Sequence, residues 1–181
     1  GQTEVCHLWN LLADETALFT LVAKDSDLAG LPEDLRASEA RAAEARGLKG
    51  QWVINNTRSA VDPVLAYGEN RALREKVWRA FVNRGDHGGK TDNKAVVTEM
   101  LQLRYQRARL LGYPTHAHWA VEQSMAGTPE RAVALMEAVW KPGAAQVKAD
   151  VAEMQAIAGK DLKIAPWDYR FYAEKLRKAK Y

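Results

Sequence analysis

The chain has 181 residues, of which 47% are hydrophobic and 27% charged, a composition typical of a globular domain with a substantial core. Its 26 basic and 23 acidic residues are interleaved and leave a net charge of only +3, which argues against a nucleic-acid partner. No stretch approaches the roughly 20 apolar residues of a membrane span, and no secretory leader is recognisable, so we expect no membrane partner. The single cysteine, Cys6, rules out an internal disulfide and favours a cytoplasmic location.

The first part of the chain predicts helix, strand, helix and strand in that order. Apolar residues over Cys6–Ala13 predict a helix that starts without a cap, so we expect the chain to be a section of a longer protein. Phe19–Ala23 and Gln51–Asn55 predict a two-stranded β-ribbon. Between them, the proline and acids of Leu31–Asp34 start an Ala-rich helix that runs to Gly47. Its charged surface buries little, so we expect it on the outside.

The most strongly patterned stretch begins with an amphipathic helix. Leu73, Val77 and Phe81 recur every four residues and predict one buried stripe. Asn70 is a suitable N-cap, and Gly85 is a suitable stop because glycine adopts the left-handed conformation at little cost.

A second amphipathic helix is predicted from Thr91 or Asp92 to Gly112. Its apolar positions are Val97, Met100, Leu101, Tyr105, Ala108 and Leu111. We expect the two helices to pack as an antiparallel pair, with the shorter segments covering its open faces.

The remaining segments predict four more helices, two of them capped by Asp62 and Asp168. Pro142 predicts a kink or break in the third of these helices, which runs from Thr128 to Gly159. We expect most of the aromatic side chains in the core. The predicted fold is mainly α, an antiparallel helical bundle-like section over residues 1–181 with at most the ribbon as sheet. The four helices run from Asp62 to Tyr67, from Thr115 to Met125, from Thr128 to Gly159 and from Pro166 towards the C-terminus.

A glycine-rich segment, Gly88–Thr91, resembles the end of a phosphate-binding loop. Arg84 stands where the full motif requires a glycine, and a helix rather than a strand is predicted before it. We therefore interpret the segment as an exposed turn between helices, and we regard nucleotide binding as a remote alternative.

No catalytic or metal-binding residue is recognisable from residue chemistry. None of the four histidines belongs to a His-Glu-x-x-His motif. His116 and His118 would point about 200° apart on a helix, so they could share a metal only on a strand or loop. Cys6 has only His7 beside it in sequence, which does not place a base against the thiol. The chain alone therefore predicts no active site.

Six short segments carry a further signal. They are Leu28–Pro32, Val64–Lys76, Arg84–Asn93, Ala108–Tyr113, Ser124–Glu130 and Pro166–Lys175. In this order they resemble the thimet oligopeptidase family of zinc metallopeptidases, and the glycine loop is most similar to the bacterial peptidyl-dipeptidases, also called dipeptidyl carboxypeptidases.

The resemblance implies a larger, mostly helical enzyme that hydrolyses short peptides in a deep channel between two lobes. Members of the family take their zinc ligands from a His-Glu-x-x-His helix and a further glutamate, which lie downstream of the segment seen here. No catalytic, cofactor-binding or metal-binding residue can be carried over to any position of this chain. The resemblance thus implies a cytoplasmic parent enzyme that uses zinc-activated water with a glutamate as general base. This chain would be an upstream scaffold and channel-wall section that is inactive alone.

The alternative is a stand-alone helical protein-interaction module without catalysis. A section of a larger enzyme should expose apolar faces and self-associate. A self-contained module should be a monomer.

Overall fold

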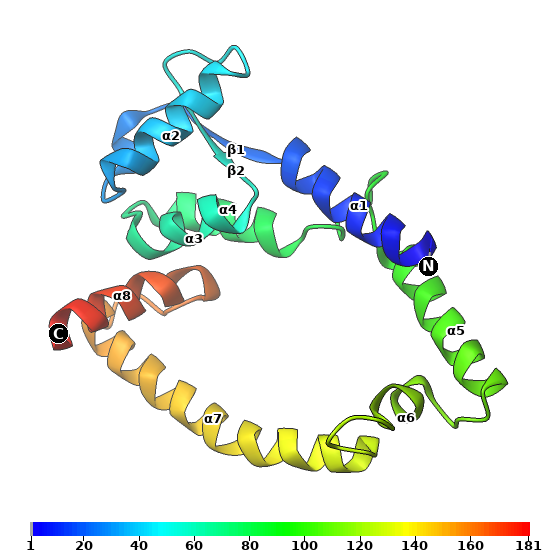
Figure 1. Cartoon of the computed structure of the whole chain (residues 1–181). Helices are drawn as coiled ribbons and strands as arrows, with labels where there is room; N and C mark the ends of the chain where they lie inside the picture. The colour runs from blue at the N-terminus through cyan, green and yellow to red at the C-terminus, as the bar shows by residue number, and fades with distance from the viewer. Residues whose placement is uncertain (1) are drawn as a thin grey trace. The chain divides into compact units, whose positions relative to one another are not determined.

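A computed structural model describes residues 2–181, which form helices and one small sheet (Figure 1). Two 3-10 helices are also present, η1 over Asp25–Leu28 and η2 over Pro166–Asp168. The fold is therefore mainly α, as the sequence predicted. The α-helices are α1 (Gln2–Ala17), α2 (Glu33–Glu44), α3 (Arg58–Tyr67), α4 (Arg71–Val82), α5 (Lys94–Leu110), α6 (His116–Val121), α7 (Pro129–Ala158) and α8 (Tyr169–Lys180).

The contacts divide the chain into two compact units. Unit 1 comprises the N-terminal residues through His7 together with Asn93–Asp150, and unit 2 comprises Leu8–Asp92 together with Val151–Tyr181. In the part of the chain that the structure describes, no helix is both long and apolar enough to cross a membrane.

The predicted β-ribbon is confirmed. Strands β1 (Phe19–Val22) and β2 (Trp52–Asn55) pair antiparallel, with Phe19 opposite Asn55. Thr20 and Val22 are buried along β1, and this alternation gives the ribbon one covered face.

The core of unit 2 joins the ribbon to α3 and α4. The predicted stripe of α4 belongs to it, because Leu73 and Val77 are buried and Phe81 packs against them. Asn70 caps this helix, since its side-chain oxygen accepts a hydrogen bond from the Leu73 amide at 3.1 Å. The buried apolar residues of this core are Val22, Leu28, Leu31, Ile54, Val61, Val64, Leu65, Leu73 and Val77.

Helices α4 and α5, which were predicted to form an antiparallel pair, each pack with other helices inside their own unit. The two helices belong to different compact units; α4 packs mainly with α3 and η2, whereas α5 packs with α6. The apolar stripe of α4 is already covered by the core of unit 2. Helix α5 begins at Lys94, slightly later than predicted, and of its apolar stripe only Ala108 is buried.

The helix start predicted at Asp62 was wrong, and so was a break at Pro142, whereas a kink there stays a prediction. Helix α3 starts at Arg58, because the amides of Ala60 and Val61 both bond to the Thr57 carbonyl, and Pro63 lies inside it. Helix α7 runs unbroken through Pro142 (Figure 1). In both helices a proline removes only one backbone hydrogen bond, and the neighbouring bonds hold the helix.

Other predicted boundaries and burials also change. Helix α6 ends at Val121, so Met125 lies in the following turn, fully exposed. Helix α2 is more covered than expected, since Glu39 and Ala43 are buried. The aromatic side chains are only partly core, because Trp9 and Trp140 are exposed.

Candidate functional site

The most elaborate polar site in unit 2 is centred on Asp168, at the junction of η2 and α8. Pro166 opens the 3-10 turn, and the Asp168 carboxylate folds back to accept a hydrogen bond from the Ala165 amide at 3.1 Å. This bond is the one made by the third residue of a capping box. Asp168 makes no side-chain hydrogen bond to the amides of α8, so its predicted role as the cap of the last helix is wrong. The same carboxylate is completely buried, which a simple cap does not require.

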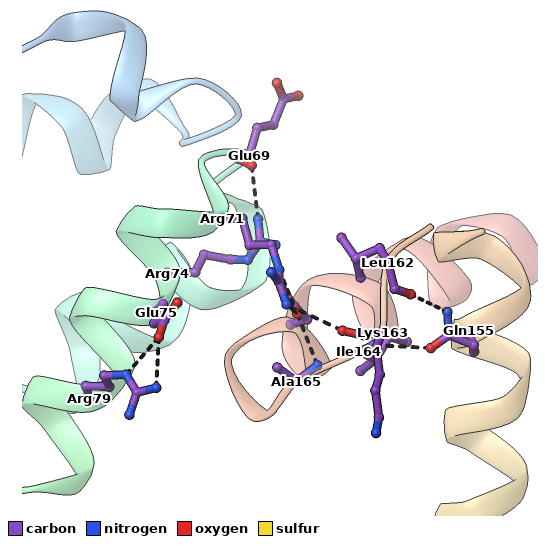
Figure 2. Close-up of polar contacts among 11 residues, drawn as sticks. Glu69, Arg71, Arg74, Glu75, Arg79, Gln155, Leu162, Lys163, Ile164 and Ala165 are labelled. Carbon is purple, nitrogen blue, oxygen red and sulfur yellow. Dashed lines mark hydrogen bonds and ion pairs between the residues drawn. The ribbon is translucent and has the colours of Figure 1, made fainter. Parts of the chain in front are cut away.

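Two arginines of α4 bind this carboxylate. Arg74 donates from Nη2 to Oδ1 of Asp168 at 2.8 Å, and Arg71 donates from Nη2 to Oδ2 at 2.8 Å and from Nε to both oxygens. The two arginines are three residues apart, so they lie on one face of the helix. Figure 2 shows their side chains reaching from α4 towards the Lys163–Ala165 segment.

The Nη1 group of Arg74 binds the turn before α4, whereas its buried Nε has no hydrogen-bond partner. Its Nη1 donates to the carbonyls of Gly68 at 2.7 Å and Glu69 at 3.1 Å. Its guanidinium also lies over the Phe171 ring of α8, 4.1 Å from the centroid, a distance suited to cation–π attraction. Arg74, only 2% exposed, thus ties α4 to α8 through both charge and packing.

Aromatic rings cover the open side of the cluster. Trp167 of η2 meets Trp78 of α4 edge to face, with ring centroids 5.8 Å apart. The guanidinium groups of Arg71 and Arg79 lie 5.7 and 5.0 Å from the Trp167 ring centroid. The cation–π and aromatic contacts therefore reinforce the same junction.

The electrostatics keep Asp168 ionised. Burial alone would raise the pKa of its carboxyl, but the hydrogen bonds from Arg71, Arg74 and the Ala165 amide outweigh it and lower the pKa below the usual range. All the donors converge on its two oxygens, so the carboxylate is poorly suited to accept a proton from a substrate. The arrangement suits mechanical support rather than acid–base chemistry.

Gln155 of α7 holds the irregular link between α7 and η2, residues 159–165, which leads into this cluster. Its Oε1 accepts from the Ile164 amide at 3.1 Å, and its Nε2 donates to the Leu162 carbonyl at 2.5 Å (Figure 2). Arg71 adds a longer bond of 3.4 Å to the Lys163 carbonyl. The irregular link is thereby fixed to both α7 and α4.

A second polar cluster anchors the glycine-rich loop. The buried carboxylate of Asp14 accepts from the Gly85 amide at 2.7 Å and the Thr91 hydroxyl, and it contacts His87 Nε2 at 2.7 Å. Burial works to raise the Asp14 pKa, but these hydrogen bonds lower it overall. The Gly88 amide donates to Asp92. Two groups of the segment that a phosphate would need, the Gly88 amide and the Thr91 hydroxyl, already have partners inside the protein, which supports the interpretation of a structural turn.

The histidines and the cysteine are scattered. His116 and His118 both lie on α6, as expected for residues that do not share a metal, and His118 Nδ1 contacts the Thr115 hydroxyl at 2.8 Å. Cys6 is exposed on α1. Among the residues whose side chains the structure describes, no group of three or more His, Cys, Asp or Glu could hold a metal ion, so these residues do not fit a zinc site.

Two aspartates have partners that the sequence did not predict. Asp62 does not cap a helix; it lies within α3 and pairs with Arg58 and Arg170, each at 3.2 Å. Asp168 was recognised only as a cap, and its pairing with Arg71 and Arg74 was missed. The available signal was the spacing of the two arginines, but nothing local identifies a partner so distant in sequence.

Comparison with known proteins gives matches that cover most of the chain. The sequence profile of Peptidase family M3 matches residues 64–181, a range that contains Arg71, Arg74 and Asp168. The chain is 34% identical over 165 residues to a dipeptidyl carboxypeptidase of Escherichia coli, covering 89% of this chain and 24% of that protein.

Oligopeptidases are matched equally well. The chain is 33% identical over 180 residues to oligopeptidase A of Escherichia coli, covering 95% of this chain and 26% of that protein. It is 34% identical over 173 residues to a probable cytosolic oligopeptidase A of Arabidopsis thaliana, covering 89% of this chain and 24% of that protein. The chain thus spans about a quarter of the length of the curated relatives it matches.

Proposed function

Because this chain belongs to Peptidase family M3, we propose that it is the helical scaffold section of a zinc-dependent peptidase that hydrolyses short peptides. The observation that carries the proposal is the Asp168 cluster, which lies within the matched range and consists of charges used for support. In this proposal residues 1–181 form a single section upstream of the zinc-binding helix. The catalytic groups lie elsewhere in a longer, cytoplasmic protein.

The proposed substrate class is a short peptide from which the longer enzyme releases dipeptides at the C-terminus. The resemblance of the Arg84–Asn93 loop to the peptidyl-dipeptidases favours this specificity over general oligopeptide cleavage, whereas the sequence identities do not separate the two. This section would supply part of the wall of the peptide channel. The Asp14 and Asp168 clusters are suited to that role because they fix loops and helix ends rigidly.

A chimeric enzyme tests the scaffold role. The matching quarter of the Escherichia coli dipeptidyl carboxypeptidase would be replaced by this chain, and zinc-dependent release of dipeptides from a short peptide would be measured. We expect the chimera to retain activity, because it supplies the same helical support. A chimera that folds and binds zinc but cleaves no peptide would contradict the proposal.

The isolated chain provides a complementary test. We expect it to bind no stoichiometric zinc and to cleave no peptide, since the zinc of the parent enzyme needs ligands that these residues do not bring together. Metal content after dialysis against zinc, together with chromatography of peptide digests, measures both. Zinc-dependent release of dipeptides by the purified chain would refute the assignment of catalysis to other segments.

The second candidate is a stand-alone interaction module, which would use the exposed apolar face of α7 to bind a partner. Every residue from Val133 to Gly143 of α7 is exposed, including large apolar side chains such as Trp140 at 75%. Such a face suits a helical partner. An isolated module that stays monomeric in sedimentation would favour this candidate, whereas a section of an enzyme should self-associate.

A further inference from the structure

Glu39 of α2 is a buried acid without a partner. It is 3% exposed, and both oxygens of its carboxyl group are covered and lack any hydrogen-bond donor. Buried carboxyl groups are normally satisfied by an amide, a cation or water. An ionised carboxylate in this position would lose its hydration without replacement.

The surface against which α2 packs offers no compensating charge. Helix α2 packs mainly on β2, and Glu39 is one helical turn from both Leu35 and Ala43, which places the three on one face. The ribbon strands, Phe19–Val22 and Trp52–Asn55, contain no ionisable residue.

The charged groups around this contact pair with residues other than Glu39. Arg36, one turn before Glu39, pairs with Asp25 of η1 and lies 3.9 Å from Glu33. Arg46, just beyond the helix, donates to the Ala42 carbonyl and to Asn55 and lies over the Phe19 ring.

The other ionisable groups nearby do not face the buried carboxyl. Asp27 of η1 accepts a hydrogen bond from Asn70 at 2.9 Å. The remaining ones are exposed side chains on α2 and on the segments beside the strands, namely Asp34, Arg41, Glu44, Lys24 and Lys49.

We propose that Glu39 makes the packing of α2 on the β-ribbon pH-sensitive: the helix is held while this carboxyl is protonated and loosens when it ionises. When α2 moves away from the ribbon, water hydrates the ionised carboxylate of Glu39. This favourable hydration is available only in the open state. The proposal is independent of the peptidase assignment, because all the groups involved lie within unit 2.

The pH range of the effect follows from the burial of Glu39. Burial raises the pKa of Glu39 from 4.5 to about 7. The folded state therefore binds a proton that the open state releases. Stability is lost progressively as pH rises from the ordinary pKa of glutamate to the raised value, and it levels off above that. The switch thus operates around neutral pH.

Hydrogen exchange of the full chain tests the proposal. Amide protection in α2 would be measured from about pH 5.5 to about pH 8, corrected for intrinsic exchange, in the wild type, in Glu39→Gln and in Glu39→Leu. Glu44→Gln, which neutralises an exposed acid of the same helix, is the matched control. We expect the protection of α2 to fall about thirtyfold over this range in the wild type and the control, because about 1.5 pH units separate its lower end from the raised pKa of Glu39. Both Glu39 variants should keep it nearly constant.

A second measurement does not depend on whether the variants fold. The carboxyl carbon of Glu39 would be titrated by NMR in the wild-type chain. A midpoint near neutrality, with exchange in α2 following the same curve, supports the proposal. A midpoint at the ordinary value for glutamate, or equal pH dependence of α2 protection in the wild type and Glu39→Gln, would overturn it.

Discussion

Arg74 and Asp168 form a buried ion pair joined by several further hydrogen bonds. Such pairs add little net stability compared with an apolar replacement of both partners, but they are costly to break from one side. Asp168 has donors from Ala165, just before η2, and from α4, so it links segments that are far apart in sequence. Its contribution is to fix the position of α8 on α4.

Replacing one partner should expose this cost. We predict that Arg74→Met destabilises the chain by about 3 to 5 kcal/mol, because Asp168 loses a buried donor and two carbonyls lose theirs. Urea unfolding monitored by circular dichroism measures the change. Arg58→Met, which removes a largely exposed arginine of α3, should cost less than about 1 kcal/mol. Equal losses in the two variants would contradict a special role for Arg74.

The two anchoring aspartates predict acid sensitivity. The pKa values of Asp14 and Asp168 are both lowered from 3.8, so the folded state holds them ionised more strongly than the unfolded state. The stability that they contribute is complete above the unfolded pKa and is lost as pH falls through the folded pKa. This range lies below that in which Glu39 acts.

Acid unfolding of a variant checks this prediction. In Asp168→Asn the slope of the unfolding free energy against pH, measured below about pH 4, should be shallower than in the wild type. Asp161→Asn, which replaces an exposed acid, should keep the wild-type slope. The same steep slope in all three proteins would show that Asp168 does not couple protonation to folding.

At the scale of elements, Gly30 marks a close approach between segments. Its φ is +84°, and a Cβ there would collide with the Tyr67 carbonyl oxygen at the end of α3. The Glu69 amide bonds to the neighbouring Ala29 carbonyl at 2.9 Å. This contact ties the start of α2 to the α3–α4 turn.

A pair of glycine substitutions separates backbone strain from crowding. Gly47 also has a positive φ, +76°, but a Cβ there would meet open space. We predict that Gly47→Ala costs about 1 kcal/mol, from the left-handed conformation alone. Gly30→Ala should cost clearly more because the carbonyl must also move. Thermal unfolding of both variants measures the difference, and equal shifts would argue against the close approach.

Helix α7 persists through two residues that normally weaken helices. Pro142 has no amide to donate to the Ala138 carbonyl, and it is exposed, so water can satisfy that carbonyl. Gly143 follows it, and a Cβ at that position would meet no other atom. The long helix is therefore maintained by its other residues.

Both positions should be open to stabilisation. We predict that Gly143→Ala stabilises α7 by up to about 1 kcal/mol and Pro142→Ala by more, approaching about 3 kcal/mol. Helix content and thermal unfolding followed by circular dichroism measure this. Destabilisation by Pro142→Ala would mean that the proline has a packing role.

At the scale of the whole chain, the exposed apolar side chains are the most informative feature. On α7, Val133, Met136, Trp140 and Val147 recur at helical spacing, and each is at least 45% exposed. We predict that the isolated chain self-associates through this face, which in the longer enzyme would be covered by other segments. Sedimentation velocity over a range of concentrations measures the association.

A charge placed within the face should abolish the association. Trp140→Glu should shift the chain towards the monomer, because burying an unpaired carboxylate at the interface is costly. Lys141→Glu adds the same side chain on a different side of α7 and should leave the association unchanged. A wild-type chain that is monomeric throughout would instead favour the interaction module.

Local pattern in the sequence was enough to predict most elements. The ribbon, the Asn70 cap and the stop of α7 at Gly159 were all predicted, because caps, turns and periodicity depend on neighbouring residues. Family membership was likewise readable from short segments in order. The start of α3 and the continuity of α7 were not, since the sequence does not show how much a single proline costs in a given helix.

The mainly helical class, the ribbon and the family follow from the sequence alone. The packing of α4 on α3, the two arginines that bind Asp168 and the burial of Glu39 without a partner became visible only in the folded chain. The physical reason is range: helices and turns form through contacts a few residues apart, whereas burial and ion pairing depend on which distant surfaces meet.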